Sequence, residues 1–206
     1  MVLDQLVDAA IAFGRNFIGT IVRPYETYRR IVDRASAWEL AYIGLLLALY
    51  FTLASLVKTA TFRPFLLTKQ FILLVSAAAI TYVCVVGTVL FAASFVRHQG
   101  SGKRFAIAWA YTLLPTVLWF LITSLLYVLL PPPRTTSAAG ILFSIVFLVF
   151  SATMFFWKMT LAYLALRFSL KLDLAKILVV SAISLPIIGL YSWAMFGLGI
   201  FKVPFL

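Results

Sequence analysis

The sequence predicts an all-α, polytopic membrane protein with five transmembrane helices and an N-terminal amphipathic cytosolic helical segment. Of its 206 residues, 64% are hydrophobic and only 11% are charged, whereas a soluble domain is about 45–50% apolar and about 25% charged. Five apolar runs are each long enough to cross a hydrocarbon core of about 30 Å. A chain of this composition lacks the polar surface to cover its apolar side chains, so the bilayer must be its solvent.

Residues 1–37 form the predicted cytosolic segment. Asp4 and Asp8 interrupt its apolar residues, so we expect no cleavable signal peptide here and expect the first span to direct insertion. Helical spacing predicts a first helix whose apolar stripe consists of Leu3, Leu6, Val7, Ala10, Phe17, Ile18 and Ile21. Its opposite side is predicted to carry Asp4, Gln5, Asp8, Arg15 and Asn16. This helix should lie on the membrane or against other helices.

A second short helix is expected to begin at Pro24, because a proline in the first turn loses no hydrogen bond. Its charged face has two interpretations. The charges either keep the helix solvated in the cytosol, or they form a docking surface for a partner.

Residues 38–206 are predicted to form the transmembrane bundle. Ser36 and Glu39 have the spacing of a capping box, which would open the first span. Pro131, Pro132 and Pro133 would end the third span, because consecutive prolines cannot continue a helix. The predicted spans cover residues 38–57, 71–96, 105–130, 139–166 and 177–200.

The distribution of lysine and arginine predicts the orientation of the bundle. Eleven of these residues fall in the N-terminal segment and in the turns after spans two and four, against five on the other side. The positive-inside rule therefore predicts a cytosolic N-terminus and an external C-terminus. A net charge of +11 in such a chain indicates attraction to anionic lipid headgroups, and we expect no nucleic-acid partner.

The turn from Arg97 to Arg104 invites comparison with a phosphate-binding loop. The Walker pattern would require glycine at position 97 and serine or threonine at position 104, and both positions carry arginine. Two interpretations stay open. The turn either only fixes topology, or the backbone N–H groups at the start of the third span, beside Lys103 and Arg104, hold a lipid phosphate.

Lys158 is the one ionisable residue within an apolar run. It either reaches the inner interface, or it lies deeper and needs a partner, because a buried lysine in the bilayer is costly. The candidate partner is Glu39, whose carboxylate could instead close its own capping box. Glu39 and Lys158 thus form a candidate intramembrane polar pair.

Few other residues could carry chemistry. Pro115 and Pro186 lie inside predicted spans and are candidate helix kinks, which serve either packing or a gate. His98 is expected to be solvated, and Cys84 is expected to be a buried packing residue. One histidine, one cysteine and six acidic residues provide no catalytic set. We therefore predict no enzymatic activity, no metal and no cofactor.

Two motifs together indicate a family. Arg23-Pro24 and Tyr28-Arg29-Arg30-Ile31 precede the first span, and the glycine-containing turn leads into Phe105 and Ala110-Tyr111-Thr112-Leu113-Leu114-Pro115. With five spans, this pattern resembles the Yip domain family (the Ypt-interacting membrane proteins) over roughly residues 20–200. The resemblance implies a role in membrane organisation or trafficking. The chain lacks the Asp-Leu-Tyr-Gly-Pro motif and the long polar tail of eukaryotic members, and it resembles the compact prokaryotic members.

The sequence thus predicts a non-enzymatic Yip-type protein of the bacterial inner membrane that acts through lipid or protein partners, or as a homo-oligomer. One alternative is a small transporter, channel or lipid-moving protein built on the proline-containing spans around Lys158. Another is an accessory subunit of a larger membrane complex. The candidate lipid or partner surface consists of Arg23, Arg29, Arg30, Arg34, Arg97, Lys103 and Arg104.

Overall fold

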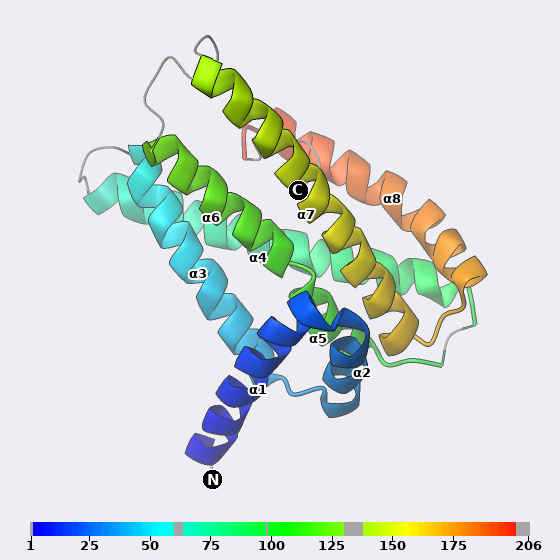
Figure 1. Cartoon of the computed structure of the whole chain (residues 1–206). Coiled ribbons are helices and arrows are strands. Elements are labelled where there is room, and N and C mark those ends of the chain that lie inside the picture. Colours follow the sequence, from blue (N-terminus) through cyan, green and yellow to red (C-terminus); the bar gives the residue numbers. More distant parts are fainter. Residues whose placement is uncertain (1, 60–63, 98, 130–137, 201–206) are drawn as a thin grey trace.

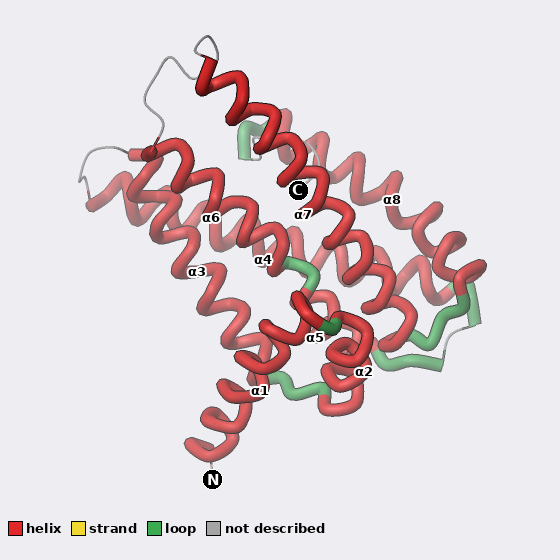
Figure 2. Tube along the Cα trace, in the orientation of Figure 1, coloured by secondary structure: helices red, strands yellow, loops and turns green. Residues whose placement is uncertain are grey.

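A computed structural model describes residues 2–59, 64–97, 99–129 and 138–200, and every regular element in these ranges is a helix (Figure 1). Where these ranges contain the whole connection between two helices, that connection is a short loop (Figure 2). In chain order they are α1 (Val2–Val22), α2 (Pro24–Arg34), α3 (Trp38–Thr59), α4 (Pro64–Ser94), α5 (Gly102–Tyr111), α6 (Leu114–Leu129), α7 (Ala138–Ser169) and α8 (Leu174–Gly197).

Five segments among the described residues are long and apolar enough to cross a membrane, as the sequence predicts. They are provided by α3, α4, α5 with α6, α7 and α8. We call one end of this bundle the basic end. There α3, α5 and α8 begin, α4 and α7 end, and α1 and α2 pack (Figure 1).

The third span is broken, whereas the sequence predicted one helix over residues 105–130 with a kink at Pro115. α5 ends at Tyr111, and tight backbone bonds from Thr112 N to Trp109 O (2.9 Å) and from Leu113 N to Ala110 O (3.1 Å) close the turn. Pro115 then lies in the first turn of α6, where its missing N–H would have no helical acceptor. Pro115 therefore starts a helix. The end of this predicted span, with Pro131–Pro133, lies outside the described residues.

The buried core lies mainly toward the basic end. Tyr28 and Ile31 of α2 pack with Tyr111 of α5 and Leu161 of α7 in one cluster. A second cluster joins α4, α5, α7 and α8 around Phe105 and Leu170. Most of the apolar surface of α7 is exposed, as expected of a helix whose solvent is lipid.

The predicted apolar stripe of α1 is only partly packed against the bundle: Phe17 lies against the core, whereas Val7, Ile18 and Ile21 are exposed. Its packed face contains Ala9, Ala12, Asn16 and Thr20, all of them buried. Ile18 is 63% exposed instead. The packed side of α1 thus combines small and hydrogen-bonding residues with Phe13 and Phe17, and the rest of the stripe stays exposed. In Figure 1, α1 runs across the direction of the spans.

Candidate functional site

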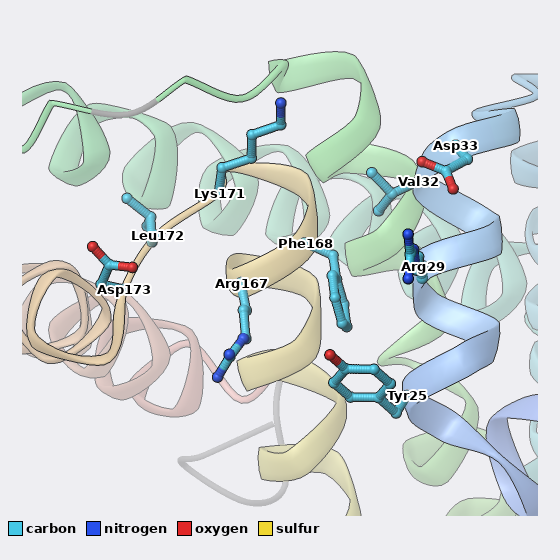
Figure 3. Close-up of a pocket in the computed structure, with 9 residues that line it drawn as sticks. All are labelled: Tyr25, Arg29, Val32, Asp33, Arg167, Phe168, Lys171, Leu172 and Asp173. Atoms are coloured by element: carbon cyan, nitrogen blue, oxygen red, sulfur yellow. The ribbon is translucent and has the colours of Figure 1, made fainter.

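A pocket of about 380 Å³ lies at the basic end, between α2 and the turn that joins α7 to α8 (Figure 3). Two separate parts of the chain form it: one face of α2, and the last turn of α7 with the residues that follow. Its lining consists of Tyr25, Arg29, Val32, Asp33, Arg167, Phe168, Lys171, Leu172 and Asp173. We call it the α2–α7 pocket.

The polar part of the pocket carries three cations and two carboxylates. Arg29 and Arg167 lie on either side of the Tyr25 and Phe168 rings, and Lys171 extends in another direction (Figure 3). The guanidinium of Arg167 donates from Nη1 to the Tyr163 hydroxyl (2.5 Å). Its Cζ also lies 5.8 Å from the centroid of the Tyr163 ring, within cation–π range. Tyr163 thus orients an arginine that is otherwise open to solvent.

The apolar part of the pocket is fixed by an aromatic contact between two helices. The rings of Tyr25 and Phe168 meet edge to face, with centroids 4.9 Å apart and an angle of 79°. Val32 is buried beside them. The pocket therefore offers an apolar wall together with guanidinium groups, and a ligand with both characters fits it best.

Lys171 has an unusual backbone conformation. Its φ is 52°, in the left-handed region that is unfavourable for residues other than glycine and asparagine. It follows the end of α7, a position that helices commonly fill with glycine. The chain thus tolerates local strain at a pocket residue.

The turn that contains Arg97 and Gly100 packs on the end of α7. Ser101 N donates to Ser169 O (3.2 Å), and Lys176 Nζ donates to Arg97 O (3.0 Å). A Cβ added to Gly100 would overlap the backbone of Ser169 and Leu170. The glycine is therefore explained by close backbone approach.

The predicted surface residues are exposed but do not form one site. Of the seven arginines and lysines proposed from the sequence, Arg29 alone lines the α2–α7 pocket. The other pocket cations, Arg167 and Lys171, were interpreted from the sequence only as topology signals. The exposed residues outside the pocket are Arg23, Arg30, Arg34, Arg97, Lys103 and Arg104.

Glu39 is the centre of a buried polar cluster, which the sequence did not predict. Its Oε2 accepts a hydrogen bond from Asn16 Nδ2 (2.9 Å) and another from the Tyr111 hydroxyl. Asn16, Glu39 and Tyr111 belong to α1, α3 and α5, and each is at most 1% exposed. The structure gives the Glu39 side chain these partners in place of the expected Ser36 capping box or Lys158.

Three buried polar atoms in or near this polar cluster have no hydrogen-bond partner within the described chain: Asn16 Oδ1, Glu39 Oε1 and the Tyr28 hydroxyl. Burial raises the pKa of the Tyr28 phenol well above its ordinary value of 10.0. A buried polar group without a partner costs free energy. Within the described chain, the hydrogen-bonding capacity of the cluster is therefore only partly used.

The remaining predicted residues lie apart from the pocket. Lys158 is half-buried on α7, and the described residues offer it no hydrogen bond or salt bridge, to Glu39 or to any other group. Pro186 lies inside α8, as expected. Cys84 is exposed, so its interpretation as a buried packing residue is wrong. His98 lies outside the described residues. No group of three potential metal-ligating residues occurs in the part of the chain that is described.

The chain matches a known protein family. The family model of the Yip1 domain matches residues 18–196, which cover most of the chain. No curated protein and no solved structure matches the chain.

Proposed function

Since this chain belongs to the Yip1 domain family, we propose that it is a non-enzymatic membrane protein whose basic end binds anionic lipids and so contributes to membrane organisation. The observation that carries this proposal is the concentration of exposed positive charge where α1, α2 and the inter-span turns meet. We propose further that this end faces the cytosol of a bacterial cell, with the N-terminus inside and the C-terminus outside.

The charges of the basic end suit a membrane surface. Arg23 before α2, Arg30 and Arg34 on α2, and Lys103 and Arg104 at the start of α5 are all exposed. Each lysine or arginine near an anionic leaflet contributes about 1 kcal/mol of attraction. Because the charges stand on separate helices, they match an extended surface of headgroups.

The first helix supports the same proposal with apolar contacts. Val7, Ile11, Ile18 and Val22 are exposed and share one side of α1, at helical spacing. The opposite side of the helix is packed against α2 and α3. A helix that runs across the spans with an exposed apolar stripe is suited to the boundary between headgroups and acyl chains.

The test is lipid-dependent stability of the full chain. The purified protein is placed in nanodiscs of phosphatidylcholine, with or without phosphatidylglycerol, and its thermal unfolding is followed at low and high salt. We expect a higher melting temperature with phosphatidylglycerol, and a difference that shrinks as salt rises, because binding to the native state stabilises it and exposed charges are screened. Equal melting temperatures in the two lipids at low salt would contradict the proposal.

A further inference from the structure

We propose that the α2–α7 pocket is a specific site for the headgroup of one anionic glycerophospholipid, with a singly charged phosphodiester and free hydroxyl groups. This inference rests on the proposed function and adds a defined location, stoichiometry and headgroup chemistry to it.

The charge of the pocket selects the headgroup. Arg29 and Arg167 come from different helices, and each presents planar N–H donors that match phosphate oxygens. When Lys171, Asp33 and Asp173 are counted as well, the three cations and two carboxylates give the lining a formal net charge of +1. One phosphodiester charge balances this lining, and the two carboxylates can accept hydrogen bonds from headgroup hydroxyls. A second negative charge would meet those carboxylates.

The volume and the apolar wall agree with this ligand. About 380 Å³ lies within the range of small-ligand sites and suits a headgroup without its acyl chains. Tyr25 and Phe168 provide an apolar wall against which the glycerol backbone of a lipid can pack.

The surface of α7 provides a path for the acyl chains. Val149 (62% exposed) and Phe156 (68% exposed) lie seven residues apart, and Tyr163 follows after another seven. This spacing places them in one row along the helix, and Arg167 lies one turn beyond Tyr163. A lipid whose phosphate reaches Arg167 can lay its chains along this row. The continuity of the row with the pocket favours a membrane lipid over a soluble phosphate.

The experiment measures binding of phosphatidylglycerol to the full chain in neutral detergent. The lipid carries a fluorophore on an acyl chain, and energy transfer from the protein reports its binding. The variants are Arg29→Gln and Arg167→Gln, and the matched control is Arg30→Gln, which removes the same charge from an exposed residue of α2 outside the pocket. Unlabelled phosphatidylglycerol, phosphatidylcholine, phosphatidic acid and glycerol phosphate serve as competitors.

Neutral detergent presents no anionic leaflet, so direct contacts in the pocket dominate. We expect saturable binding of one lipid, weakened about five- to tenfold by either pocket substitution and less than twofold by Arg30→Gln. Unlabelled phosphatidylglycerol should compete best. Equal effects of Arg29→Gln and Arg30→Gln would overturn the pocket assignment and leave the general attraction to anionic lipid standing. Equal competition by phosphatidylcholine would overturn both. Competition by glycerol phosphate as strong as by the lipid would show a soluble phosphate ligand, and preference for phosphatidic acid would contradict the selectivity for one charge.

Discussion

Two fully buried tyrosines allow a matched test of the polar cluster around Glu39. Tyr111 donates its hydroxyl hydrogen to Glu39 Oε2, whereas the Tyr28 hydroxyl has no partner within the described chain. Both side chains are 0% exposed. Replacing either tyrosine with phenylalanine removes one oxygen and preserves the ring, so the two substitutions differ mainly in whether a hydrogen bond is lost.

The expected effects have opposite signs. Tyr111→Phe removes a hydrogen bond to a carboxylate and leaves that oxygen with Asn16 as its donor, a loss of about 1.5–3 kcal/mol in the free energy of unfolding. Tyr28→Phe removes a buried hydroxyl that makes no bond, so stability should stay unchanged or rise by about 1 kcal/mol. The two variants should therefore differ by at least about 1.5 kcal/mol.

The assay is reversible unfolding in mixed micelles, in which the fraction of denaturing detergent is raised and circular dichroism is recorded. A thermal version should separate the variants by at least about 3 °C, since a chain of this length shifts by about 2–4 °C per kcal/mol. Equal destabilisation by the two substitutions would refute the reasoning, because it would show that both hydroxyls make bonds of similar worth.

Four further predictions concern other parts of the chain. Lys171→Gly relieves a left-handed conformation and should stabilise the fold by about 1 kcal/mol; a lower melting temperature would contradict this. Gly100→Ala forces a Cβ into the backbone of Ser169 and should lower the free energy of unfolding by about 1–3 kcal/mol. Gly14→Ala serves as the control in the same melting experiment, because its added Cβ meets no atom within 4 Å. Lys158→Leu removes a side chain without a described partner, so unfolding should be no easier than in the wild type, and a marked loss of stability would show that Lys158 has a partner in the membrane. Because burial raises the pKa of Tyr28, this phenol ionises in the unfolded state first as the pH rises above about 10. The free energy of unfolding should therefore fall above this pH, and it should fall less steeply in Tyr28→Phe. Identical pH profiles of the two proteins would contradict this prediction.

The five spans could be predicted from the sequence because each depends on local hydropathy. Span four, for example, ends at Ser169, where the sequence predicts residue 166. The break in span three was harder to predict from the sequence. The sequence marks Pro115 as a candidate helix kink. Whether this proline bends a helix or begins one depends on the turn at Thr112 and Leu113, which hydropathy does not encode.

The sites were harder to predict because they depend on contacts between distant residues. Glu39 binds Asn16 and Tyr111, which lie 23 and 72 residues away. Tyr111 belongs to the motif that indicates the family, but nothing in the sequence pairs it with Glu39. The α2–α7 pocket likewise is lined by Arg29 and Arg167, which lie far apart in the sequence. Positive charge in the turns indicated a possible lipid surface as well as topology, but nothing in the sequence places Arg29 near Arg167.

Photocrosslinking tests the central claim, that an anionic lipid occupies the α2–α7 pocket, most directly. Phosphatidylglycerol with a photoreactive group on its headgroup is incorporated into membranes that contain the full chain. The membranes are irradiated, and the labelled residues are mapped by mass spectrometry. The account predicts labelling of pocket residues such as Tyr25, Phe168 and Leu172, and its loss when Arg167 is replaced by glutamine. Labelling confined to the opposite end of the bundle, or equal labelling of the pocket by a phosphatidylcholine probe, would contradict it.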